Sequence, residues 1–204
     1  RSVENFHHGC ELVRNGRIGK VTRVEVGLPT GSPGKNNPVE PVPEGVDWDF
    51  WLGPAPRVPF RGVLHWNWRW MMDYSGGQLT DWAGHHIDIA HWGLGLDDTG
   101  PVEIEGHGVY PQEGIYDVPT EYKFTCRYAN GVEMVVANDK QLPKGMGTVW
   151  YGEKGWIHVD RGRQATNPPE LWQEVIGADE TRLYNSRDHQ QNFLDCVKSR
   201  QKTI

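Results

Sequence analysis

The sequence predicts an α+β fold, in which helices pack on one face of a large, mostly antiparallel and open β-sheet. Between residues 102 and 159, five runs rich in β-branched and aromatic residues follow one another at short intervals. Two of these intervals, at 129–131 and 153–155, contain the glycine of a tight hairpin turn. Segments whose apolar residues recur at helical spacing lie before and after this region. Consecutive strands flanked by helices are typical of an antiparallel sheet that is covered on one face.

Three longer helices are expected. Apolar residues from Val3 to Val13 recur at helical spacing until Asn15-Gly16 ends the pattern. A second helix is predicted over Gln78–Trp92, which Gly93 and Gly95 would end. The last one covers Arg187–Arg200, with an apolar face formed by Phe193, Leu194 and Val197.

Strands and irregular segments account for the rest of the chain. The predicted strands are Lys20–Leu28, Val102–Tyr110, Tyr122–Tyr128, Val132–Asn138, Thr148–Tyr151 and Trp156–Val159. Pro29–Gly45 is interpreted as an ordered but irregular loop, Asp47–Leu52 as a short helix or turn, and Leu64–Met72 as an extended aromatic segment.

Composition narrows the class of protein. The chain has 204 residues, 37% of them hydrophobic and 24% charged, as expected of one globular domain with a core. It contains no run of about 18 apolar residues, so we expect neither a transmembrane helix nor a membrane partner. The formal net charge of -6 argues against a nucleic-acid partner. Cys10, Cys126 and Cys196 form no CxxC pair, which favours reduced thiols. Cytoplasmic localisation fits this pattern, and a periplasmic one would require a twin-arginine signal on the full-length protein.

Tryptophan is the most unusual feature of the composition. Six of the ten tryptophans fall between residues 48 and 82. Large aromatic side chains of this kind can form a core. They can equally line a cleft in which flat rings stack on the apolar C–H faces of sugars. Both interpretations are open at this point.

The candidate chemistry lies on the helix predicted over Gln78–Trp92. With 3.6 residues per turn, Asp81, His85, Asp88 and Trp92 fall on one face. Asp81 and His85 allow three interpretations: a helix-start carboxylate with a buried histidine, two ligands of a metal site completed by His65 or His86, or a general acid–base pair acting on a hydroxyl group. A neutral histidine near a carboxylate is what proton transfer at neutral pH requires. Nothing in the sequence fixes a third metal ligand, so we expect no metal.

The same helix carries a family resemblance. The segment GGQLTDWAGHHID, from Gly76 to Asp88, resembles the "GGG-x-L-x-D-x-G-x-H-x-x-D" signature of the Gfo/Idh/MocA oxidoreductases, with Ser75 in the place of the first glycine. Three further segments resemble the family in the same order, at residues 11–21, 151–157 and 189–194. The tryptophan-rich insert and the His85-His86 pair resemble a bacterial, carbohydrate-utilising branch.

This resemblance implies roles for individual residues. Asp81 and His85 inherit the catalytic positions that handle the proton of the substrate carbinol, while a nicotinamide takes hydride from the same carbon. The region before the motif lines the family's substrate cleft, so His65, Trp66 and Arg69 are candidate sugar contacts. Tyr74 and His86 are further candidates: Tyr74 through its hydroxyl, and His86 through its place beside His85. On a helix, however, His86 points about 100° away from His85, which also fits a structural role.

The resemblance also implies that this chain is one part of a larger enzyme. No E-K-P motif supplies the family's catalytic lysine, and no G-x-G-x-x-G follows a strand. We therefore expect residues 1–204 to be a single substrate-binding and catalytic domain, cut from a longer protein at both ends. The N-terminal dinucleotide-binding (Rossmann) domain is expected to be absent and to hold most of the NAD or NADP site, whose residues are unknown. The fragment alone is then expected to be inactive.

Several functions remain open. The first is oxidation of a CH–OH group in a sugar or polyol by a dehydrogenase that depends on NAD(P). Others are an NAD-dependent glycosidase that oxidises transiently, eliminates and reduces again, a non-enzymatic carbohydrate-binding protein, and a metal-dependent hydrolase or isomerase. The resemblance also implies a homo-oligomer that associates through the exposed face of the sheet. Strand residues 122–127 alternate between apolar and polar, as expected of a sheet with one drier face.

Overall fold

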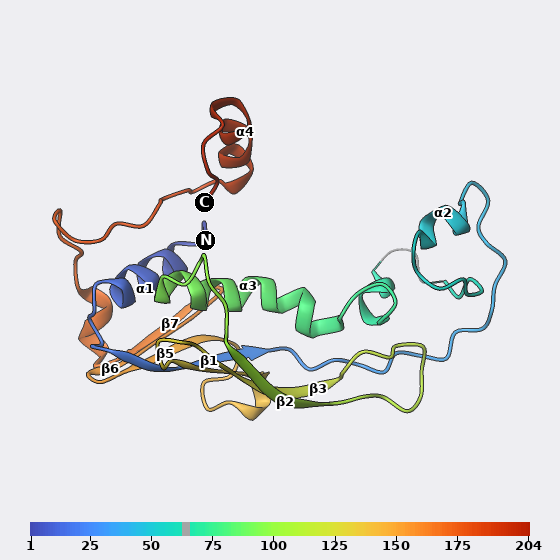
Figure 1. Ribbon diagram of the computed structural model, residues 1–204, viewed down its shortest axis with the longest axis horizontal. Coiled ribbons are helices and arrows are strands. Elements are labelled where there is room, and N and C mark those ends of the chain that lie inside the picture. The colour runs from blue at the N-terminus through green and yellow to red at the C-terminus, as the bar shows by residue number, and fades with distance from the viewer. Residues whose placement is uncertain (63–65) are drawn as a thin grey trace.

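The computed structural model describes residues 1–62 and 66–204, and these form a seven-stranded open sheet (Figure 1). The strand order is β2-β3-β4-β1-β5-β6-β7. β1 and β4 pair in parallel, and every other neighbouring pair is antiparallel. The strands are β1 (Val21–Leu28), β2 (Glu103–Val109), β3 (Glu121–Arg127), β4 (Glu133–Asn138), β5 (Gly147–Gly152), β6 (Gly155–Asp160) and β7 (Arg163–Asn167). The predicted α+β class and the mostly antiparallel sheet are confirmed.

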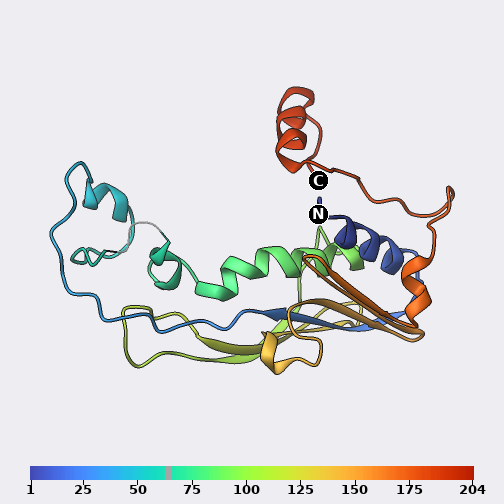
Figure 2. The ribbon, with the colours of Figure 1, turned by 180° about the vertical axis from the view of Figure 1, so that it is seen from behind.

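Helices lie on one face of the sheet, as predicted. Figures 1 and 2 show α1 (Glu4–Arg14) and α3 (Gly77–Leu94) side by side over the strands. α4 (His189–Ser199) stands beyond them on the same side, and α2 (Trp48–Leu52) lies at the far end of a long excursion of the chain. The apolar face predicted for the last helix is present, but Phe193, Leu194 and Val197 are exposed on it.

The core lies between the two helices and the inner face of the sheet. Its centre is the fully buried indole of Trp150 on β5, which donates a hydrogen bond from Nε1 to the Ala90 carbonyl at 3.3 Å. Gly93 makes this approach possible, because a Cβ there would lie 2.7 Å from the Trp150 ring. The expectation that Gly93 ends the helix was therefore wrong: it is a packing glycine inside α3. Gly95, with φ 70°, is the residue that ends it.

The excursion between β1 and α3, residues 29–76, is here called the arm. It contains α2, whose first turn is capped by the Asp47 carboxylate accepting from the Phe50 amide at 2.9 Å. It also contains the 3-10 helix η1 (Asn67–Trp70). The extended conformation predicted for Leu64–Met72 is thus wrong over the four residues of η1, because alternating tryptophans resemble a strand in sequence.

The β-strand boundaries agree with the prediction to within one or two residues, but one strand was missed. β7 has the sequence RQATN, whose residues are mostly exposed and show no apolar alternation. It forms through antiparallel pairing with β6 at the edge of the sheet. On β3 the predicted alternation holds, since Tyr122 and Cys126 are buried in the core.

Candidate active site along helix α3

The start of α3 is defined by a glycine that no other residue can replace without strain. Gly77 has φ 67°, and a Cβ on it would lie 2.4 Å from Val118. The Gly76 amide donates to the Thr80 hydroxyl at 3.1 Å, which satisfies one of the free amides at the helix start. The chain thus enters α3 in one fixed direction, and Asp81 follows just after the first turn.

Asp81 is held by an arginine from the arm. The Nε of Arg69 on η1 donates to Asp81 Oδ1 at 3.1 Å. The guanidinium also lies over the rings of Trp66 and Trp68, at 4.3 and 4.9 Å from their centroids. Trp66 remains 71% exposed. The structure therefore brings together three residues predicted for the site, Asp81, Arg69 and Trp66, where the arm meets α3.

His85 lies one turn further along α3 and opens into a cavity of about 560 Å³. Asp88 and Arg161 line the same cavity, together with Arg187 from the segment before α4. Burial first, and then the positive charge of Arg161, lower the pKa of His85. The imidazole is therefore neutral at pH 7, and one of its nitrogens can accept a proton.

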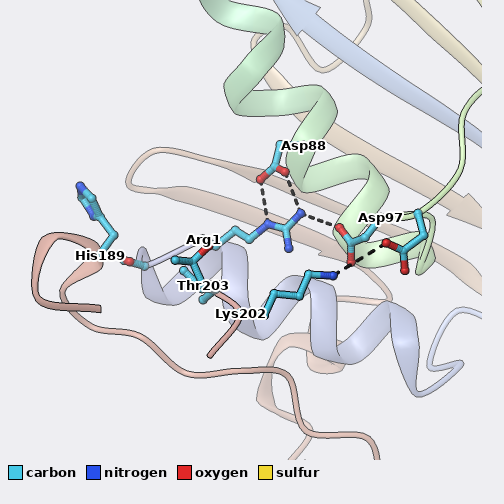
Figure 3. Close-up of a pocket in the computed structure, with 9 residues that line it drawn as sticks. Arg1, Asp88, Asp97, His189, Lys202 and Thr203 are labelled. Carbon is cyan, nitrogen blue, oxygen red and sulfur yellow. Dashed lines mark hydrogen bonds and ion pairs between the residues drawn. The ribbon is translucent and has the colours of Figure 1, made fainter. Parts of the chain in front are cut away.

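Asp88, the next residue on this face, is already paired. Arg1 donates to both of its carboxylate oxygens, at 2.9 and 2.7 Å, and reaches Asp97 at 2.5 Å (Figure 3). Trp92, one turn beyond, is buried below the Arg1 guanidinium, 5.2 Å from its ring centroid. The face predicted from helical spacing thus passes from solvent at Asp81 into the core at Trp92.

The prediction of His86 as a substrate contact needs correction. Its side chain has an exposed fraction of 0%, so no atom of it is accessible to a ligand. It stacks on Trp82 with ring centroids 5.9 Å apart, and its Nε2 lies 3.7 Å from Asp160 Oδ1, too far for a hydrogen bond. Among residues 1–62 and 66–204, neither ring nitrogen has a hydrogen-bond partner. Burial lowers the pKa of His86 to about 4.

The two remaining candidates lie elsewhere. His65 falls outside the described residues. Tyr74 lies in the arm, where its ring meets Trp51 edge-on at 5.0 Å between centroids. Its buried hydroxyl has no hydrogen-bond partner in the part of the chain that the structure describes. The structure therefore does not join Tyr74 to the group around Asp81.

Sequence reasoning missed Arg161. This residue follows β6 in a turn, lies over the Trp82 ring at 5.0 Å and lines the cavity of His85. A basic residue in a polar turn carries no signal of this in the sequence. Among the residues that the structure describes, no three His, Cys, Asp or Glu side chains converge in a way that could hold a metal ion.

Comparison with known families identifies the domain. Residues 6–204 match the model of the oxidoreductase family, C-terminal alpha/beta domain, of the Gfo/Idh/MocA group. The chain belongs to the Gfo/Idh/MocA oxidoreductase family. This confirms the resemblance carried by the segment from Gly76 to Asp88. No curated protein matches the chain in sequence.

Several solved structures have a similar fold. The WlbA dehydrogenase from Bordetella pertussis, solved with NADH and UDP-GlcNAcA, has 14% identity and a TM-score of 0.55, over 98% of this chain and 52% of that one. An NAD-binding protein from Listeria innocua has 15% identity and a TM-score of 0.55, over 98% and 52%. The aldose-aldose oxidoreductase from Caulobacter crescentus, solved with glycerol, has 15% identity and a TM-score of 0.54, over 98% and 54%. The chain spans about half the length of these proteins.

A helix that crosses a bilayer must be both long and apolar. In the described part of the chain, no helix is long and apolar enough to cross a membrane.

Proposed function

We propose that this chain is the substrate-binding and catalytic domain of a nicotinamide-dependent oxidoreductase that acts on a CH–OH group of a carbohydrate or polyol. The observation that carries the proposal is His85: a neutral imidazole that opens into a cavity, one helical turn from a carboxylate. Membership of an oxidoreductase family supports the reaction class.

In this proposal His85 accepts the hydroxyl proton of the substrate. Burial and Arg161 keep the imidazole unprotonated before the reaction, and the nearby Asp81 carboxylate favours the imidazolium that forms. Asp81 is itself oriented by Arg69, whose guanidinium lies over the rings of Trp66 and Trp68. His85, one turn further on, meets the Trp82 ring edge-on with centroids 5.7 Å apart.

The cofactor belongs to a part of the protein outside these residues. A bound nicotinamide would supply the acceptor for the hydride of the carbinol carbon. The chain contains no G-x-G-x-x-G after a strand, so it supplies no phosphate-binding loop of its own. We propose that a dinucleotide-binding domain of the same protein presents NAD or NADP to the side of α3 that carries Asp81 and His85. The NADH complex of the Bordetella pertussis dehydrogenase supports a nicotinamide cofactor in this role.

The substrate class rests on the surroundings of Asp81. The exposed indole of Trp66 offers a flat apolar face beside the charged groups of Arg69 and Asp81. A sugar or polyol has both an apolar C–H face and hydroxyl groups, and it fits this combination. The ligands in two similar folds, UDP-GlcNAcA and glycerol, are of this chemical kind.

The proposal is tested in the full-length protein with the substitutions Asp81→Asn and His85→Ala. Formation of NAD(P)H would be followed with a panel of sugars and polyols at saturating cofactor. We expect each variant to lose about 100-fold or more in kcat, the usual contribution of a positioned acid–base group. Near-normal turnover in both variants would contradict the assignment of these residues.

The assembly of the protein is a separate proposal. The face of the sheet opposite α1 and α3 carries an ion-pair network on Arg127, which reaches Glu103, Glu105 and Glu133. We propose that this face meets a second copy of the chain. Light scattering of the wild type and of an Arg127→Glu variant tests it, with a wild-type monomer as the outcome that refutes it.

A further inference from the structure

The cavity in which His85 lies carries a surplus of positive charge. Arg161 lines it from the turn after β6, and Arg187 lines it from the segment before α4. Asp88 is the only carboxylate among the described residues that line it, and Arg1 holds both oxygens of that carboxylate (Figure 3). The whole chain has a formal net charge of -6, so this local surplus is opposite in sign to the overall balance.

The two arginines of this cavity are not neutralised by neighbouring carboxylates. In the described part of the chain, neither the Arg161 nor the Arg187 guanidinium forms an ion pair with an aspartate or glutamate. The carboxylates next to them in sequence have other partners: Asp160 pairs with Arg163, and Asp188 accepts from two amides at the start of α4. Two positive charges on one cavity repel each other, and an anion bound between them would remove this repulsion.

The guanidinium of Arg161 is held beside His85 by an indole. It lies over the Trp82 ring, 5.0 Å from the centroid. Trp82 in turn meets the His85 ring edge-on, with centroids 5.7 Å apart. The Arg161 amide donates to Asp160 Oδ1 at 2.7 Å, which fixes the turn that carries the side chain. An arginine held in this way presents its planar set of N–H donors with little further loss of side-chain entropy on binding.

The charge of Arg161 acts at the place of the proposed proton transfer. It is one of the causes that lower the pKa of His85, after burial. An anion bound to this guanidinium would cancel part of its charge and raise that pKa, so the imidazole would become a stronger base once the ligand is in place. A ligand with a negatively charged group would therefore both satisfy the arginines and prepare His85 for its proposed role.

We propose that Arg161 and Arg187 bind an oxyanion group of the substrate, so that the protein acts on a sugar or polyol that carries a carboxylate or a phosphate. Two oxygens of such a group can accept in parallel from one guanidinium, which fixes the sugar relative to His85. A neutral sugar would leave both guanidinium groups without a charged partner. This inference names the substrate class of the proposed function, and it rests on that function for the assignment of the His85 cavity as the substrate site.

The experiment measures binding to the full-length protein by calorimetry, so that its result does not depend on turnover. The probes are D-glucuronate, D-galacturonate, D-gluconate and D-glucose 6-phosphate, compared with glucose, galactose, D-glucitol and glucose, respectively. At least one charged probe is expected to bind about tenfold or more tightly than its neutral counterpart, because hydrogen bonds to charged groups are stronger than neutral ones. The sugar acids and the sugar phosphate distinguish the two sources of the oxyanion.

Two substitutions assign the oxyanion to the arginines. Arg161→Gln and Arg187→Gln are each expected to reduce the affinity for the charged probe about tenfold, and to leave the affinity for its neutral counterpart unchanged. Arg163→Gln is the matched control, because it removes the same charge from the same turn, and Arg163 does not line the His85 cavity. This variant should bind every probe as the wild type does. Both lining arginines are exposed, so their substitution removes no buried contact, and circular dichroism checks that each variant is folded.

Each outcome decides the proposal. If no charged probe binds more tightly than its neutral counterpart, or if Arg161→Gln and Arg187→Gln bind it as the wild type does, the oxyanion site does not exist. An equal loss in Arg163→Gln would show a general effect of net charge and overturn the proposal. Weaker binding of NAD or NADP in the two variants, with sugar binding unchanged, would assign the arginines to cofactor phosphates and overturn it as well. Tight binding of a charged probe without any NAD(P)H formation would instead refute the proposed oxidoreductase function and leave the oxyanion site standing.

Discussion

The two adjacent histidines on α3 lie in opposite environments. His85 opens into a cavity shared with Arg161, and its ring can meet a ligand. His86 is fully buried and stacked on Trp82, and no described residue hydrogen-bonds either of its nitrogens. A rotation of about 100° per residue separates them. The comparison teaches that the position of a side chain on the helix, and not its chemical type, decides whether it is available for chemistry.

The largest effect on stability is expected at His86. His86→Ala removes a buried ring from a packed interior and is expected to lower the free energy of unfolding by about 2–5 kcal/mol. His86→Leu fills most of the same space and removes two unpaired nitrogens, so it should cost far less. Chemical denaturation of the two variants measures this difference. Equal losses in both would mean that the ring nitrogens contribute bonds which the structure does not show.

The same residue should make stability depend on pH. Burial lowers the pKa of His86 from its ordinary 6.5 to about 4. Between these two values the unfolded chain binds a proton that the folded chain does not, so the free energy of unfolding falls as the pH decreases from 6.5 to about 4. This effect lowers the free energy of unfolding by roughly 3 kcal/mol at about pH 4, and it vanishes above pH 6.5. Denaturation of wild type and His86→Leu at pH 7.5 and 4.5 should show a smaller loss in the variant, and parallel losses would refute it.

A smaller effect is expected on the exposed side of α3. The positive charge of Arg161 is one of the causes that lower the pKa of His85. Arg161→Gln should therefore raise that pKa, which NMR titration of the His85 ring measures directly. Arg163→Gln is the matched control, because Arg163 binds Asp160 and does not line the cavity of His85. An equal shift in both variants would show that the effect is a general one of net charge.

Much of the fold could be predicted from the sequence because its signals are local. Runs of β-branched and aromatic residues predicted the strands β1 to β6, and apolar residues at helical spacing predicted α1, α3 and α4. β7 was not predicted, because its conformation depends on pairing with β6 and not on an apolar pattern in its own residues. η1 differs from the predicted extended segment, because tryptophans at alternate positions are the sequence pattern of a strand.

The candidate site could be predicted only in part. Asp81 and His85 follow from spacing on one helix and from a recognisable motif. The contribution of Arg161, the pairing of Asp88 with Arg1 and the burial of His86 depend on which elements meet in space. Helical periodicity alone could show that His86 faces away from His85, but it could not show that His86 faces the core.

One matched pair of substitutions tests the central claim most directly. His85→Leu and His86→Leu would be made in the full-length protein, and turnover and thermal midpoint would be measured on the same samples with the same sugar. We expect His85→Leu to lose about 100-fold or more in kcat with an unchanged midpoint, and His86→Leu to keep its turnover within a few-fold. Loss of turnover in His86→Leu, with His85→Leu still active, would contradict the assignment of the two sides of α3.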